Sequence, residues 1–253
     1  MGETGTTAII PARLHSSRLP GKPLADICGK PMVLRVVERV KKIKSIGRTV
    51  VATDSREIFD TVKKHGFEAV MTDSAHTSGT DRLAEAAEIL ALEPEEIVVN
   101  VQGDQPLVEP ETVEAVLNAL LRSDSAVMAT AACPMSREEA RDPNRVKVVL
   151  DCSGNALYFS RSLIPFDRDG ILRNESKPYL RHIGIYAYPV NFLQKFVKMA
   201  PGRLESIEKL EQLRVIENGF DIAVKILKAA PVDVDTRDDL KAVRKIFGKS
   251  LRS

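Results

Sequence analysis

The sequence predicts an α/β fold, with a mainly parallel central sheet and a smaller α+β lobe. In the first half of the chain, short β-branched runs alternate with segments of helical apolar spacing, which is the order found in βαβ units. The second half is less regular and contains two adjacent strand-like runs that predict a hairpin. Because 43 % of the 253 residues are hydrophobic, the chain can bury the core that such a fold requires.

The first half supplies the predicted parallel sheet. Its strands are short apolar runs, and its helices carry apolar residues three and four positions apart. Gly66 is placed to end the second helix, and Pro110 is placed at the first position of the fourth. The predicted strands are 6–10, 48–53, 67–71 and 96–101, and the predicted helices are 31–44, 58–63, 81–92 and 110–121.

A parallel sheet binds its ligands at the carboxyl ends of its strands. We therefore expect functional residues in the loops 11–24, 53–55, 72–80 and 102–108.

The second half predicts a lobe and a return to the body. Asp151 to Gly154 join the two strands of the hairpin, and residues 165–180, rich in Pro, Asp, Arg and Gly, predict a mobile loop. The predicted elements are the strands 145–150, 155–160, 181–188 and 220–227, two helices after residue 188, an extended segment at 231–235 and a helix at 237–247. The predicted organisation is a body at 1–132, a lobe at 133–220 and a return to the body at 221–253.

Composition excludes several classes of protein. The 37 Lys and Arg residues nearly balance the 35 Asp and Glu residues, so a dedicated nucleic-acid binder is not expected. No uncharged apolar run approaches the roughly 18 residues of a membrane span, and the first residues lack the features of a signal peptide. Three widely spaced cysteines form no CxxC pair, which favours a reduced, cytoplasmic protein over a disulfide or zinc scaffold.

A basic loop directly after the first strand carries the strongest functional signal. It begins at Pro11-Ala12 and places Arg13 and Lys22 at its two ends, with serines, prolines and a glycine between them. A phosphate-binding site needs cations, backbone N–H groups and a rigid backbone. The loop is neither a Walker A loop nor a GxGxxG turn, and its composition makes a merely solvated turn the weaker interpretation.

Two aspartates are candidates for binding a hard cation. Asp104 follows the apolar strand at 96–101, where Gly103-Asp104 fits a Mg²⁺ ligand or a simple turn equally well. Asp235 lies where an extended segment meets a helix, so helix capping competes with metal binding and is favoured by the local pattern. Asp233 is expected to point to the opposite face.

Two further polar groups leave alternatives open. In the loop that enters the helix at 81–92, Thr80 or Asp81 is expected to cap the helix, while Ser78 could approach a ligand. His182 lies on one face of a predicted strand with Gly184 and Tyr186, an unusual set for a pure core. A buried structural histidine and a ligand contact are equally compatible with that pattern.

Together these motifs resemble the 3-deoxy-manno-octulosonate (Kdo) cytidylyltransferases over nearly the whole chain and in family order. The resemblance rests on P-A-R-L-H-S-S-R-L-P-G-K-P-L, H-T-S-G-T-D-R-L-A-E, V-N-V-Q-G-D-Q-P, F-S-R-S-L-I-P-F, R-H-I-G-I-Y-A-Y, L-E-Q-L-R-V-I-E-N-G and V-D-T-R-D-D-L. It implies a Rossmann-like nucleotidyltransferase fold, transfer of CMP from CTP to Kdo with release of pyrophosphate for lipopolysaccharide synthesis, and a homodimer formed through the second lobe.

The resemblance also implies roles for individual residues. Arg13 and Lys22 would hold the triphosphate, and Asp104 and Asp235 would bind Mg²⁺, which reverses the capping interpretation of Asp235. The other implied nucleotide contacts are Ala12, Ser78, Arg82 and Gln102, and the implied contacts to the sugar acid are Arg161, His182, Tyr186, Glu211 and Gln212.

Departures from the family pattern concern the identity of the sugar. Ser55 and Gln105 stand where an acid is common, and Val234 replaces a frequent glycine. An amino-substituted Kdo is therefore an alternative acceptor, and a sialic acid a weaker one because of the motifs at 181–188 and 210–214. A catalytically inactive nucleotide-binding module is disfavoured, since all the implied metal ligands and triphosphate cations are retained.

Overall fold

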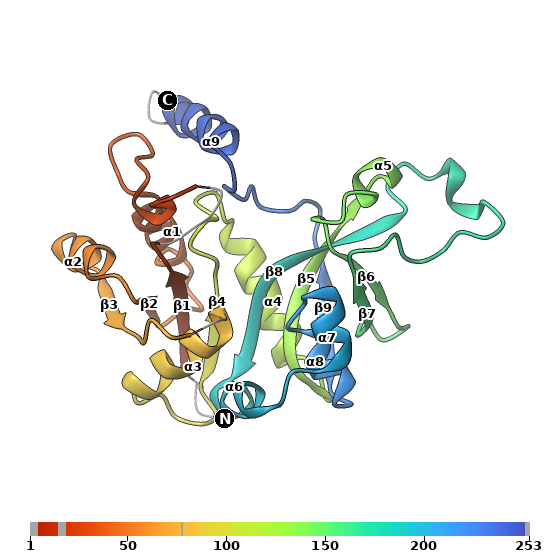
Figure 1. The fold of residues 1–253 in the computed structure, drawn as a ribbon, viewed down its shortest axis with the longest axis horizontal. Coiled ribbons are helices and arrows are strands. Elements are labelled where there is room, and N and C mark those ends of the chain that lie inside the picture. The colour runs from red at the N-terminus through yellow and green to blue at the C-terminus, as the bar shows by residue number, and fades with distance from the viewer. Residues whose placement is uncertain (1–4, 15–18, 77, 251–253) are drawn as a thin grey trace. The chain divides into compact units, whose positions relative to one another are not determined.

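The computed structural model describes residues 5–14, 19–76 and 78–250, and it divides the chain into two compact units (Figure 1). The first unit contains residues 1–114, 189–193 and 231–253. The second unit contains residues 115–188 and 194–230. Each unit is therefore built from separate stretches of the chain.

A parallel sheet forms the centre of the first unit, as predicted. Its described strands follow the order β3-β2-β1-β4, and each pair of neighbours runs parallel. Ala8, Ile9 and Ile10 are consecutive in β1 and have no exposed surface, so both faces of the sheet are covered. The strands are β1 (Thr6–Ala12), β2 (Arg48–Thr53), β3 (Glu68–Met71) and β4 (Ile97–Asn100).

The helices of the first unit follow the predicted pattern with shifted ends. The helix predicted at 31–44 ends at Val40, and the one predicted to begin at residue 81 begins at Gly79. Gly66 has a φ of 75° just beyond the second helix, which confirms it as the terminating residue. The elements are η1 (Lys22–Leu24), α1 (Met32–Val40), α2 (Arg56–Lys64), α3 (Gly79–Ile89), α4 (Pro110–Leu121), which ends in the second unit, and α9 (Arg237–Ser250).

The C-terminal helix α9 is part of the first unit because its apolar face packs on N-terminal elements. Leu240, Val243 and Phe247 form one buried cluster with Ile27 and Met32. Val234, which precedes the helix, is fully buried in the same cluster. This packing fixes the segment that carries Asp235.

The second unit contains a strand that the sequence did not predict. β5 (Ala126–Met135) pairs antiparallel with β8 (Tyr179–Pro189) and parallel with β9 (Asp221–Ile226). Its alanines and Pro134 have low strand propensity, so only burial between two partners makes this segment a strand. The predicted hairpin is confirmed as β6 (Lys147–Leu150) and β7 (Ala156–Ser160).

Two other sequence predictions for this unit were wrong in detail. Helices α6 (Val190–Lys198), whose first residues belong to the first unit, α7 (Arg203–Glu208) and α8 (Leu213–Glu217) follow β8, where two helices were expected. Lys209 adopts a left-handed φ of 54°, which ends α7 and separates it from α8. The region 165–180, predicted as a loop, contains a short helix, η2 (Ile171–Asn174), and the first residues of β8. The second unit also contains the short helix α5 (Arg137–Ala140).

Within the described ranges, no helix combines the length and the apolar composition needed to cross a membrane.

Candidate active site

A buried lysine lies between two carboxylates in the first unit. Lys22 Nζ donates to Asp104 Oδ2 at 2.6 Å and to Asp235 Oδ1 at 2.9 Å. Burial lowers the pKa of Lys22, but the charges and hydrogen bonds of the two aspartates outweigh burial and raise the pKa above its ordinary value. Lys22 is therefore a cation at neutral pH, and it contacts two other predicted site residues, Asp104 and Asp235, from distant parts of the sequence.

The backbone places each of these three residues. Gly21 has a φ of 68°, a left-handed conformation that suits glycine and starts the short helix carrying Lys22. At Gly103 a Cβ atom would lie 2.8 Å from the carbonyl oxygen of Pro11, so only glycine allows this loop to approach β1 closely. Gly103 thus lets the loop lie against the end of β1, and Asp104, the next residue, contacts Lys22 from that position.

Asp235 does not cap α9, so the capping interpretation from the local pattern was wrong. Thr236 takes that role, because its Oγ1 accepts from Asp239 N at 3.2 Å while Asp239 accepts from Thr236 N at 2.7 Å. Val234 N donates to the carbonyl oxygen of Asp104 at 3.0 Å, which holds the two aspartate-bearing segments side by side. The carboxylate of Asp235 is therefore available for Lys22.

Asp233, for which no role was expected, accepts a hydrogen bond from Gln105 Nε2 at 2.8 Å. This contact pairs the neighbours of Asp104 and Asp235 and adds a second connection between their segments.

Arg13 connects the basic loop to the start of α3. Its Nη2 donates to the carbonyl oxygen of Ser78 at 2.5 Å. Ser78, and neither Thr80 nor Asp81, is the N-cap of α3: Ser78 Oγ accepts from Asp81 N at 3.1 Å, and Asp81 accepts from Ser78 N. Residues 15–18 and Thr77, which belong to the two predicted motifs, lie outside the described residues.

We expect Ser78→Ala to lower the free energy of unfolding by about 1 kcal/mol, because Asp81 N loses its capping acceptor. Ser78→Thr keeps the hydroxyl and is the matched control, expected to retain most of the stability. Urea denaturation of both variants measures the effect, and an unchanged midpoint for Ser78→Ala would show that the cap contributes nothing.

Arg82 is fully buried and forms an ion pair. Its Nη2 contacts Asp54 Oδ2 at 2.6 Å, and its Nη1 donates to the hydroxyl of Thr72. The pKa of Arg82 is lowered from its ordinary value. Burial is the largest cause, the charge of Arg13 adds to it, and the charge of Asp54 partly opposes it. The pair ties α3 to the carboxyl ends of β2 and β3, and the nucleotide contact implied for Arg82 stays a prediction.

A cleft of about 170 Å³ opens at the basic loop and the loop that carries Asp104. Arg13 and Lys22 supply cations to its wall, and Gln102 and Asp104 supply oxygen atoms. The cleft thus combines groups that bind phosphate with a group that binds a hard cation. Its lining residues are Pro11, Ala12, Arg13, Lys22, Pro23, Gln102, Gly103 and Asp104.

The donor set of Asp104 and Asp235 fits Mg²⁺. Both carboxylates contact the same ammonium group, so they converge on one small volume next to the cleft. Mg²⁺ is usually held by one or two carboxylates together with substrate phosphates and water. No group of three or more His, Cys, Asp and Glu side chains gathers as a metal site within the described residues.

In the second unit, a half-buried histidine and a half-buried tyrosine lie side by side on β8. The rings of His182 and Tyr186 are 5.5 Å apart, and the ring of Phe159 meets His182 edge-on at 4.9 Å. Burial, assisted by the charge of Arg181, lowers the pKa of His182 to about 3. Burial, assisted by the charge of Glu211, raises the pKa of Tyr186. Both side chains are therefore neutral at physiological pH.

The contact of His182 with Thr130 indicates its tautomer. Thr130 Oγ1 lies 3.0 Å from His182 Nε2 and donates its one hydrogen toward the backbone carbonyls of β8, at 2.8 Å for Ile185. With that hydrogen on a carbonyl oxygen, the hydroxyl oxygen accepts from Nε2–H, and Nδ1 is the hydrogen-bond acceptor of the ring. A neutral imidazole with this tautomer can accept a hydrogen bond from a sugar hydroxyl.

The other predicted sugar contacts belong to the same unit. Gln212 is 5 % exposed, and among the described residues its Nε2 has no hydrogen-bond partner; its contact with the sugar stays a prediction. Arg161 Nε donates to the carbonyl oxygen of Glu208 at 2.7 Å, and its Nη1 donates to that of Pro143 at 3.1 Å. Sequence patterns gave no role to Glu208 or to Lys147, which the structure places next to Arg161.

A family model and two relatives of known name all identify cytidylyltransferases as similar to this chain. A family model described as cytidylyltransferase matches residues 7–226. The chain is 51 % identical over 251 residues to a 3-deoxy-manno-octulosonate cytidylyltransferase of Neisseria gonorrhoeae, covering 96 % of this chain and 98 % of that protein. It is also 51 % identical over 239 residues to the protein of the same name from Syntrophobacter fumaroxidans, covering 93 % and 94 %.

A solved structure shows the same fold. It is a CMP:2-keto-3-deoxy-manno-octonic acid synthetase complexed with CTP, and it superposes with a TM-score of 0.91 at 38 % identity. The match covers 98 % of this chain and 100 % of that chain. The predicted α/β fold class is thereby confirmed.

Proposed function

Because the chain belongs to the cytidylyltransferase family, and within it to the 3-deoxy-manno-octulosonate cytidylyltransferases, we propose that it transfers CMP from CTP to the anomeric hydroxyl of Kdo. The products are CMP-Kdo and pyrophosphate, and the proposed role is the supply of activated Kdo for lipopolysaccharide. One observation carries the proposal: a buried lysine bridges two aspartates beside a basic cleft at the carboxyl ends of parallel strands.

The reaction is a displacement at the α-phosphorus of CTP. The oxygen of the anomeric hydroxyl forms the new bond to the α-phosphorus, the bond from that phosphorus to the pyrophosphate oxygen breaks, and the hydroxyl proton passes to water. Negative charge then develops on the departing pyrophosphate, so cations fixed beforehand stabilise the transition state. In this proposal Arg13 and Lys22 provide those cations, and the contact of Arg13 with Ser78 keeps its guanidinium in place.

We propose Mg²⁺ as the metal and Asp104 and Asp235 as the residues that hold it. When bound, Mg²⁺ neutralises phosphate charge and orients the triphosphate. Lys22 keeps the two carboxylates together before substrate arrives, and Ala12, Ser78, Arg82 and Gln102 belong to the proposed nucleotide site.

The sugar acid is proposed to bind in the second unit. Neutral His182 and Tyr186 offer an acceptor and a donor for hydroxyl groups, and Gln212 offers a buried N–H. Arg161 carries the positive charge suited to a carboxylate, and Glu211 completes the proposed set. Residues 133–220 are proposed as the sugar-binding and dimerisation lobe.

A homodimer in the cytoplasm is proposed as the assembly and location. The exposed apolar side chains of Leu157, Phe166 and Ile207 on the second unit support a protein interface. Cys28, Cys133 and Cys152 are free thiols, which supports a reducing compartment.

Release of pyrophosphate from CTP tests the function. We expect release that requires both Kdo and Mg²⁺, with sialic acid giving at most about one hundredth of the kcat/KM because its contacts are incomplete. An amino-substituted Kdo in the same assay tests the alternative acceptor. Equal kcat/KM values with Kdo and sialic acid, or no release with either, would contradict the proposal.

A further inference from the structure

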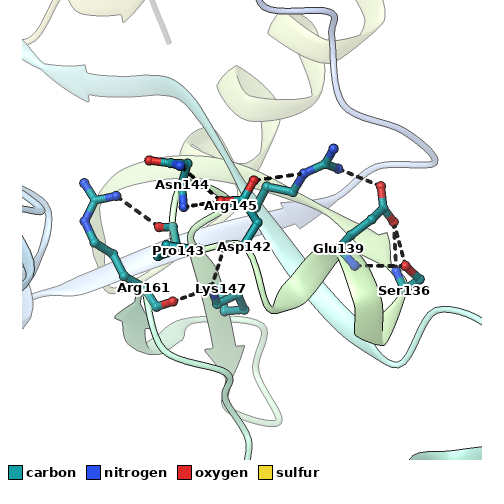
Figure 2. Close-up of polar contacts among 8 residues, drawn as sticks. All are labelled: Ser136, Glu139, Asp142, Pro143, Asn144, Arg145, Lys147 and Arg161. Carbon is teal, nitrogen blue, oxygen red and sulfur yellow. Dashed lines mark hydrogen bonds and ion pairs between the residues drawn. The ribbon is translucent and has the colours of Figure 1, made fainter.

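Lys147 is a fully buried lysine whose ammonium group contacts backbone oxygens. Its side chain extends from β6, and Nζ donates to the carbonyl oxygen of Arg161 at 2.5 Å and to that of Asp142 at 3.2 Å (Figure 2). Burial lowers the pKa of Lys147, and nearby acidic groups partly oppose this. With no exposed surface, this amine cannot reach a substrate, so any functional role must act through the groups that it holds.

The strand pairing places Lys147 between two proposed sugar-binding residues. Lys147 is paired with Ser160 of β7 on one side and with Arg181 of β8 on the other. Arg161 directly follows Ser160, and His182 directly follows Arg181. The backbone N–H of His182 also donates to the carbonyl oxygen of Val146 at 2.8 Å. Residues 146 and 147, at the start of β6, therefore connect β7, which Arg161 directly follows, with β8, which carries His182.

Arg161 is fixed from several sides, and Lys147 supplies the contact to its backbone oxygen. Glu208 accepts from the backbone N–H of Arg161 at 2.9 Å and from the hydroxyl of Ser160 at 2.6 Å. The Arg161 side chain reaches back to the carbonyl of Glu208 and across to that of Pro143. Pro143 is the neighbour of Asp142, so the loop that Lys147 holds is the loop that Arg161 contacts (Figure 2).

We propose that Lys147 is a positioning residue for the acidic sugar: it fixes the backbone of Arg161 and the 142–143 loop so that the Arg161 guanidinium is held ready for the sugar carboxylate. This inference rests on the proposed function and extends it to a residue that never touches the substrate. Burying an ammonium group costs free energy, and its two backbone contacts fall on Arg161 itself and on Asp142, whose neighbour Pro143 accepts a hydrogen bond from the Arg161 guanidinium.

The test compares Lys147→Met with the wild type in the pyrophosphate-release assay, with the KM for Kdo and the KM for CTP measured separately. We expect the KM for Kdo to rise about tenfold or more, because the displaced Arg161 guanidinium no longer has the position and orientation needed to bind the sugar carboxylate. The KM for CTP should stay within about twofold, since all the proposed nucleotide contacts are in the first unit. Lys147→Gln, which keeps an N–H donor, should give a smaller rise and carries the test if Lys147→Met does not fold.

A double-mutant cycle separates positioning from general destabilisation. Because Lys147 acts through Arg161, Lys147→Met should add nothing to the KM for Kdo once Arg161 is replaced by alanine. Arg145→Gln is the matched control, since Arg145 lies in the same segment and its side chain pairs with the carboxylates of Glu139 and Asp142, not with the backbone oxygens that Lys147 contacts (Figure 2). Its KM for Kdo should match that of the wild type.

The outcomes distinguish the two proposals. A wild-type enzyme that releases no pyrophosphate with Kdo would overturn the proposed function. A wild-type enzyme that is active, combined with an unchanged KM for Kdo in the Lys147 variants, would overturn only the positioning role. The same Lys147→Met effect in the presence and absence of Arg161 would also overturn the positioning role.

Discussion

Asp104→Asn is expected to lower kcat by about a thousandfold while the protein remains folded. Asparagine has the shape of aspartate but no charge, so one of the two carboxylates proposed to hold Mg²⁺ is lost. Removing one preorganised electrostatic contact from an active site commonly has an effect of this size. Lys22 still contacts Asp235 in the variant, which should keep the local backbone in place. Steady-state kinetics with CTP and Kdo measure the loss, and circular dichroism checks the fold.

Asp233→Asn is the matched control for this experiment. Asp233 lies two residues from Asp235 and accepts a hydrogen bond from Gln105, which asparagine can also accept through its side-chain oxygen. We expect kcat close to the wild-type value. Wild-type turnover in Asp104→Asn would exclude Asp104 as an essential ligand, and an equal loss in both variants would indicate a general effect of charge.

Asp54→Ala is expected to destabilise the protein by about 3 kcal/mol or more, because it leaves the fully buried guanidinium of Arg82 without its counter-charge. The change falls at the carboxyl end of β2, where Arg82 joins α3 to the sheet. Urea denaturation followed by circular dichroism measures the free energy of unfolding, and CTP that binds the folded state should restore part of it.

Asp60→Ala provides the comparison for Asp54→Ala. Asp60 also pairs with an arginine, at 2.9 Å from Arg56, but both side chains are mostly exposed. The unfolding midpoint of this variant should stay near that of the wild type, since exposed pairs contribute little. Similar midpoints for the two variants would contradict a structural role for the buried pair.

Regular local patterns made much of the fold predictable. The apolar runs at 6–10 and 48–53 predicted strands of the parallel sheet, and Gly66 and Pro110 marked helix ends, because backbone geometry and capping depend on neighbouring residues. The segment 126–135 gave no such signal. It is a strand because β8 and β9 pair with it on either side. Local propensity cannot predict pairing between segments that lie far apart in the sequence.

The candidate sites show the same division. Arg13, Lys22 and Asp104 were found from their positions after strands. The local pattern at Asp235 indicated a helix cap, the family motifs reversed that interpretation, and the structure assigns the cap to Thr236. Lys147 and Asp54 received no role because neither lies in a motif that carries the family resemblance. The structure shows that Lys147 is buried against the backbone of Arg161 and that Asp54 pairs with the buried Arg82.

The sequence by itself determined the fold class, the basic loop and, through its motifs, the family to which the chain belongs. These depend on residue types at short spacings, which a linear chain records directly. The tertiary structure decided which charges meet: Lys22 with Asp104 and Asp235, Arg82 with Asp54, and Lys147 with the backbone of Arg161. An ion pair or a buried donor depends on distance and desolvation, and both arise only when segments far apart in the chain pack together.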